Sequence, residues 1–182
     1  MSDSRYSPWV RRFHWLVFIL VACALALIYL NGWSPRGSVL GADAEWAHMQ
    51  FGIAILLIML PRLLVRVRNG SAPPITPPSP RWQMALVKLV HVVLYLLLFA
   101  IPILGISMMV SRGHPWNFLG MPLPHLSAPD RPLAHLLEKL HTTCGNILMY
   151  LAGAHALIGL YHHFAQHDDT LKRMLPPVRD NT

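Results

Sequence analysis

Long apolar runs alternate with short polar stretches along the whole chain. Four of these runs are each long enough to cross roughly 30 Å of hydrocarbon as a helix. They cover about residues 13–30, 46–65, 84–110 and 140–165. Helix-start signals precede them in order: Ser7-Pro8, Asp43, Ser79-Pro80, and Asp130 with Pro132. The pattern predicts an all-α fold, an integral membrane four-helix bundle with helices at about residues 8–30, 44–66, 80–110 and 132–167.

Composition and charge agree with a lipid environment. The chain is 54% hydrophobic and only 13% charged, and its 182 residues with short connections favour one transmembrane domain over residues 1–182. Four of the fifteen Lys and Arg residues (Arg36, Arg112, Arg131 and Lys139) fall on one side of the predicted bundle, which leaves eleven on the other. The positive-inside rule makes the richer side cytoplasmic and places both termini there. Since anionic lipid accounts for the net charge of +7, no nucleic-acid partner is expected.

Five histidines within or near the apolar runs are the main candidates for chemistry. His141 and His155 are fourteen residues apart, which places them within about 40° of one helix face and roughly 21 Å apart along it. His48 lies near the outer start of another run, whereas His14 and His91 lie near inner starts. Ionisable residues inside a membrane are functional candidates by default, although each ring can instead bond a carbonyl of a neighbouring helix.

Two stacked haems suit this arrangement. His48 and His141 can supply the two axial ligands of an outer haem. His155 can be one ligand of an inner haem, and the spacing alone does not decide whether His14 or His91 is the other. Glycine follows His48, His141 and His155 at four residues (Gly52, Gly145 and Gly159) and leaves room on the same face for a flat macrocycle. No Cys-x-x-Cys-His motif is present. Any haem is therefore expected to be non-covalent haem b.

An ordered set of motifs resembles the bacterial cytochrome b561 family over the whole chain. These motifs are Tyr6-Ser7, Phe13-His14-Trp15-Leu16, Pro61-Arg62-Leu63, Ala100-Ile101-Pro102-Ile103-Leu104-Gly105, Arg112-Gly113-His114-Pro115-Trp116, the run from His155 to His162-His163, and Thr170-Leu171-Lys172-Arg173-Met174-Leu175-Pro176. The resemblance implies a di-haem protein of the bacterial inner membrane that passes electrons from periplasmic superoxide to ubiquinone.

The resemblance also implies roles for individual residues. It assigns His14 and His155 to the inner haem, and His48 and His141 to the outer haem. Residues matching Ser7, His91 and His162 lie near the quinone headgroup in that family. Arg112 and Trp116 belong to a family-like loop and are candidates for guiding superoxide to the outer haem.

Two other functions fit the same residues. An electron-relay cytochrome b subunit would receive electrons from a partner redox protein and pass them to the quinone pool. A transporter for a divalent metal would use the imidazoles at two depths as successive sites. Absorption spectra separate the transporter from the two haem proteins, and mixing with superoxide separates the enzyme from the relay.

Overall fold

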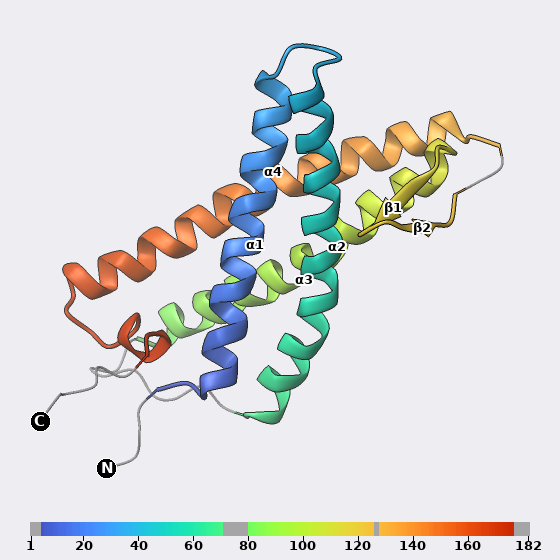
Figure 1. The fold of residues 1–182 in the computed structure, drawn as a ribbon. Coiled ribbons are helices and arrows are strands. Elements are labelled where there is room, and N and C mark those ends of the chain that lie inside the picture. Colours follow the sequence, from blue (N-terminus) through green and yellow to red (C-terminus); the bar gives the residue numbers. More distant parts are fainter. Residues whose placement is uncertain (1–4, 71–79, 126–127, 177–182) are drawn as a thin grey trace, which may run out of the picture.

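The structure is a computed structural model that describes residues 5–70, 80–125 and 128–176. Its elements are α1 (Pro8–Trp33), α2 (Val39–Arg68), α3 (Arg81–Arg112), a hairpin of β1 (Trp116–Phe118) and β2 (Met121–Leu123), α4 (Arg131–Phe164) and the short 3-10 helix η1 (Lys172–Met174) (Figure 1). Four of the helices are long and apolar enough to cross a membrane. The predicted all-α class is therefore confirmed.

Helix starts follow the capping signals at two of the four helices. Ser7 caps α1 by accepting from the Val10 N–H, and Asp130 caps α4 by accepting from the Leu133 N–H. α2 begins at Val39, five residues before the predicted start at 44, because the Ser38 side chain and not Asp43 accepts from the Gly41 N–H at 3.1 Å. Ser79, the predicted cap of α3, lies outside the described residues.

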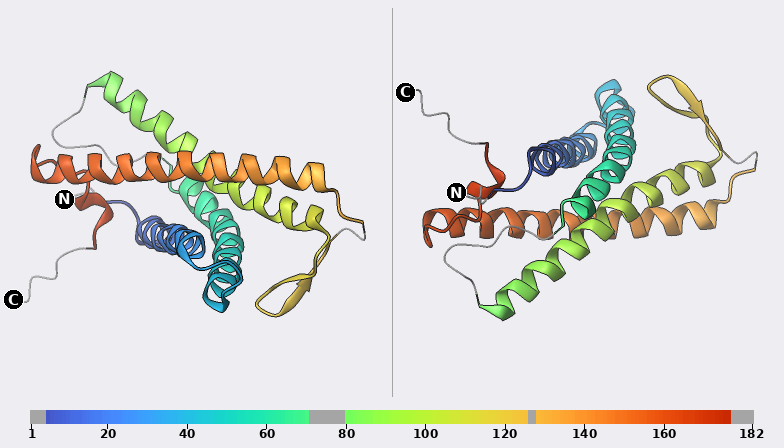
Figure 2. Two further views of the ribbon diagram at one scale, coloured as in Figure 1. Left: turned by 90° about the horizontal axis from the view of Figure 1, so that it is seen from above. Right: turned by 90° about the horizontal axis from the view of Figure 1, so that it is seen from below.

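The four long helices form two antiparallel pairs that lie across one another. α1 packs chiefly on α2 and α3 on α4, and α2 also contacts α3. Figure 2 shows α3 and α4 crossing each other to one side of the α1 and α2 pair. A cluster of buried apolar side chains joins all four helices: Val17, Ala24, Ile55, Met59, Leu98 and Leu148. Dispersion contacts in this cluster hold the two pairs together.

The outer surfaces of the helices are apolar. Leu57, Leu96, Ile103, Tyr150 and Leu157 are each at least half exposed. Contiguous apolar surface of this extent is rare on proteins in water and is what a lipid-facing bundle requires. The exposed positions therefore agree with the membrane environment that the composition predicts.

The segment after α4 folds back onto the start of α1. The Trp15 indole donates to the Met174 carbonyl at 2.9 Å, Arg11 Nη1 donates to the Leu175 carbonyl at 2.7 Å, and the Tyr6 N–H donates to the Arg173 carbonyl at 3.2 Å. The end of the molecule that holds this contact is called the inner end below, and the end that holds the hairpin is called the outer end (Figure 1).

The β-hairpin is fastened to α2 at the outer end. Gln50, which is 8% exposed, donates from Nε2 to the Asn117 carbonyl at 3.0 Å and accepts from the Leu119 N–H at 2.8 Å. Trp116 is buried, and its indole donates to the Pro124 carbonyl at 2.8 Å. These bonds satisfy buried polar groups and fix the hairpin beside the turn of α2 that carries His48.

Candidate metal centres

Two histidines from different helix pairs face each other in the outer half of the molecule. His48 of α2 and His141 of α4 have ring centroids 6.1 Å apart and planes at 85°. His48 Nδ1 donates to the Ala24 carbonyl at 2.8 Å, and His141 Nδ1 donates to the Ile101 carbonyl at 2.9 Å. Because a carbonyl only accepts, both rings carry hydrogen on Nδ1 and keep a lone pair on Nε2.

The spacing of these rings fits one metal ion between them. An imidazole nitrogen binds a transition-metal ion at about 2 Å and the ring centre lies roughly 1 Å further away, so two rings on opposite sides of one ion have centres roughly 6 Å apart. A hydrogen bond to a neighbouring carbonyl was expected as an alternative to metal binding. Here these bonds use Nδ1 and leave Nε2 of each ring able to bind a metal.

Both rings line an apolar cavity of about 260 Å³, to which all four long helices contribute residues. Gly52 and Gly145 line it, and a Cβ added at either would meet no atom within 4 Å. The open space beside these glycines is what the sequence pattern predicts for a flat macrocycle. The cavity, the ring spacing and the lone pairs on Nε2 together fit a haem.

A further glycine, Gly105 of α3, allows His141 to approach α3 closely. A Cβ added there would lie 3.0 Å from His141 Cε1 and 3.2 Å from its Nδ1. The residue was noted in the sequence only as part of a family motif. Its contact with His141 joins residues 36 positions apart and has no local signal in the sequence.

Three histidines meet in the inner half. His155 of α4 lies 6.3 Å from His14 of α1 and 5.2 Å from His91 of α3, measured between ring centroids. The first distance matches two rings on one metal ion, and the second is too short for that arrangement. His91 Nδ1 donates to the Val87 carbonyl of its own helix at 2.6 Å.

Arg62 is the charged neighbour of the inner histidines. It donates from Nη2 to His14 Nδ1 at 3.3 Å, and its guanidinium lies 5.1 Å from the centre of the Tyr95 ring. A ring that binds a metal through Nε2 carries its hydrogen on Nδ1. Arg62 therefore has to release His14 when His14 binds a metal in that way.

The outer and inner histidines are separated by the apolar cluster. Leu148 of α4 is in this cluster and lies seven residues from both His141 and His155. The two candidate ligands of α4 are roughly 21 Å apart along the helix, as their spacing predicts. The molecule thus holds two histidine sites at different depths with packed hydrocarbon between them.

The remaining predicted inner residues lie near the folded-back tail. Ser7 caps α1 with its side chain. His162 in the last turn of α4 donates from Nδ1 to Asp168 Oδ2 at 2.5 Å. Burial alone would raise the pKa of Asp168, but hydrogen bonds from His162 and Thr170 outweigh burial and hold that pKa below its usual range. Asp168 was not singled out from the sequence, because the family-like tail motif begins two residues later, at Thr170.

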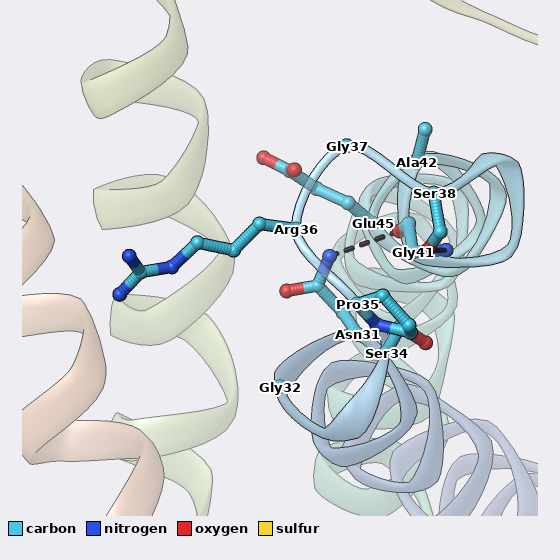
Figure 3. Close-up of a pocket in the computed structure, with 10 residues that line it drawn as sticks. All are labelled: Asn31, Gly32, Ser34, Pro35, Arg36, Gly37, Ser38, Gly41, Ala42 and Glu45. Carbon is cyan, nitrogen blue, oxygen red and sulfur yellow. Dashed lines mark hydrogen bonds between the residues drawn. The ribbon is translucent and has the colours of Figure 1, made fainter.

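Arg112 and Trp116 lie at the outer end, where the sequence places them. Arg112 lies between two carboxylates, 3.7 Å from Glu45 and 3.5 Å from Glu138, and these ion pairs offset its positive charge. Glu45 also lines a cavity of about 440 Å³ at the connection between α1 and α2 (Figure 3). In Figure 3 the Arg36 side chain extends away from the other residues of that cavity.

The described residues contain no group of three or more His, Cys, Asp or Glu side chains placed to hold a metal ion directly. Opposed histidine pairs instead suit a metal whose other four ligands come from a macrocycle. An iron with histidine on both faces has no open position, and such centres carry electrons. Fold and site together define a membrane electron-transfer protein with haem.

Comparison with known proteins gives the family. The sequence profile of prokaryotic cytochrome b561 matches residues 5–177. The chain is 37% identical over 173 residues to cytochrome b561 homolog 1 of Escherichia coli K12, which covers 95% of this chain and 98% of that protein. It is 37% identical over 169 residues to the probable superoxide oxidase CybB of Yersinia pestis, covering 91% of this chain and 93% of that protein.

A further relative is cytochrome b561 homolog 2 of Escherichia coli K12, which is 32% identical over 182 residues and covers 96% of this chain and 93% of that protein. The chain belongs to the prokaryotic cytochrome b561 family. The resemblance stated from the sequence motifs is therefore confirmed. The protein is a multi-pass membrane oxidoreductase that transfers electrons through haem b.

Proposed function

We propose that this protein oxidises superoxide on the periplasmic side of the bacterial inner membrane and passes the electrons through two b haems to ubiquinone. The observation that carries the proposal is the pair of facing histidine sites at two depths, with centroid distances of 6.1 and 6.3 Å. The similarity to the probable superoxide oxidase of Yersinia pestis supports the choice of electron donor.

The proposed outer haem is held by His48 and His141, and the proposed inner haem by His14 and His155. The centroid distances favour His14 over His91 as the partner of His155, because the rings of His91 and His155 are only 5.2 Å apart. That preference agrees with the family resemblance. Each bound haem would accept and release one electron at a time, which links a one-electron donor to a two-electron acceptor.

The chain's own residues supply position and environment in this scheme. The Ala24 and Ile101 carbonyls hold His48 and His141 through Nδ1, and both residues line the shared cavity. The apolar cluster between the sites excludes water from the path. The excess of Lys and Arg near the inner end orients that end, and both termini, toward the cytoplasm.

The two substrates are assigned to opposite ends. We place ubiquinone at the inner end near Ser7, His91 and His162, where protons from the cytoplasm are available. Superoxide is proposed to approach the outer haem near Arg112 and Trp116. Since Glu45 and Glu138 offset the Arg112 charge, we assign Arg112 a local role at the entrance and no long-range attraction.

Stopped-flow mixing of the purified protein with superoxide tests the proposal. We expect the haem absorbance to change to that of the reduced form after mixing with superoxide. Added ubiquinone should then reoxidise the haems without any partner protein. Superoxide dismutase in the syringe should abolish the reduction, which serves as the control. Haems that superoxide leaves oxidised, and that only a partner redox protein reduces, would establish the electron-relay function instead.

A further inference from the structure

The pair formed by His162 and Asp168 lies outside the two histidine sites and is built by the tail that follows α4. His162 is seven residues after His155, which places it within about 20° of the same helix face and roughly 10 Å further toward the inner end. Its side chain is 17% exposed and that of Asp168 only 4%. The imidazole therefore lies between the inner histidine site and the inner surface, with a nearly buried carboxylate against it.

The backbone around Asp168 is shaped to present this carboxylate. His167 has a φ of 53°, a left-handed conformation that residues other than glycine rarely adopt. The Asp168 N–H donates to the His162 carbonyl at 3.2 Å, and the Thr170 N–H donates to Asp168 Oδ1 at 2.9 Å. Both carboxylate oxygens thus have partners, and Oδ2 is directed at His162 Nδ1.

The tail that carries Asp168 is itself anchored to α1. Its bonds to Tyr6, Arg11 and Trp15 tie residues 173–175 to the first turns of that helix. The backbone segment that carries Asp168 is therefore held between the end of α4 and the anchored residues 173–175. A merely exposed carboxylate would need no such support.

We propose that Asp168 is a positioning residue that holds His162 as the proton donor for quinone reduction at the inner end. This inference rests on the proposed function. A carboxylate on Nδ1 fixes the tautomer and orientation of an imidazole and stabilises its protonated form. The protonated His162 then gives its Nε2 hydrogen to a quinone carbonyl oxygen, and the Nδ1 hydrogen stays on the imidazole, hydrogen-bonded to Asp168.

The step balances with the electrons that the established electron-transfer activity supplies. The quinone takes up two electrons and two protons to become quinol, and each donation leaves His162 neutral. Water at the inner surface returns a proton to Nε2 before the next donation. Asp168 stays ionised throughout, so it changes no proton count and acts only through His162.

The test compares Asp168→Asn with Asp169→Asn, a matched control that removes the same charge from the neighbouring position. We expect Asp168→Asn to keep the wild-type haem content and the wild-type rate of haem reduction. Reoxidation of the haems by a short-chain ubiquinone should become about tenfold slower or more. Its solvent deuterium isotope effect should increase, because proton transfer would then limit the rate.

A double-mutant cycle separates positioning from a structural role. His162→Gln removes the donor, and we expect Asp168→Asn to slow reoxidation no further in that background. Additive effects of the two substitutions would overturn the proposal, as would a wild-type rate in Asp168→Asn. Loss of haem from Asp168→Asn would assign the carboxylate to folding of the tail and would also overturn it. If ubiquinone fails to reoxidise the haems of the wild-type protein, the proposed function itself is refuted.

Discussion

Replacing Gly105 with alanine tests the ligand role of His141 without touching a histidine. The added Cβ would lie 3.0 Å from His141 Cε1, which is closer than carbon atoms pack, so the ring has to give by a few tenths of an ångström. A movement of that size weakens the 2.9 Å bond from His141 Nδ1 to the Ile101 carbonyl, which orients the ring.

The expected cost follows from the overlap. Crowding a packed site by one methyl group costs about 1–3 kcal/mol. If that cost falls on the bound state, the outer haem binds roughly 5- to 140-fold more weakly, since 1.4 kcal/mol is a factor of ten. We expect the variant to purify with less than the full complement of haem, or with a changed outer haem.

Haem content per polypeptide and electron paramagnetic resonance of the oxidised protein measure this outcome. The low-spin signal of one haem should weaken or shift while the other stays unchanged. Gly32→Ala is the control, because Gly32 is also in a long helix and a Cβ there meets no atom within 4 Å. Full occupancy and an unchanged spectrum in Gly105→Ala would refute the reasoning that the close approach of His141 to Gly105 controls binding of the outer haem.

Four further predictions use the same preparations. His141→Ala should lose the outer haem and keep the inner one, and retention of both haems would contradict the assignment. His91→Ala should keep both haems while quinone reduction slows, whereas His14→Ala should lose the inner haem; the reverse outcome would make His91 the ligand. Gly145→Ala places a methyl group in the space proposed for the outer macrocycle, so its haem content should fall although the protein without haem has room for it. The pKa of the Asp168 carboxyl is lower in the folded protein than in the unfolded chain. The ionised carboxylate therefore stabilises the fold fully above the ordinary carboxyl pKa, and this stabilisation is lost as the pH falls through the lower pKa of the folded state. The difference in melting temperature between the wild type and Asp168→Asn, followed by haem absorbance, should therefore shrink as the pH falls from about 6 to about 3.

The spanning helices could be predicted because apolar length is a local property of the sequence. Ser7 and Asp130 cap their helices because side-chain capping also acts over a few residues. The start of α2 was predicted wrongly for a local reason as well. Ser38 and Asp43 are both suitable cap residues, and the helix begins after Ser38 because the Ser38 side chain accepts from the Gly41 N–H.

The histidine sites were only partly predictable. The spacing of His141 and His155 on one helix gave two depths, but the choice between His14 and His91 depends on how α1 and α3 cross α4. That crossing is a tertiary property and leaves no periodic signal in either helix. The contacts of Gly105 with His141 and of Asp168 with His162 were missed for related reasons, since the first depends on helix packing and the second on a left-handed turn.

The folded-back tail has a consequence for how the protein matures in the cell. His14 leaves the ribosome long before Met174, yet the neighbouring Trp15 is bonded to the Met174 carbonyl. The start of α1 therefore stays unfastened until residues 173–175 have been translated. We expect the cofactor proposed for the inner histidine site to be inserted after this tail has been synthesised, and deletion of residues 173–175 to impair that insertion first.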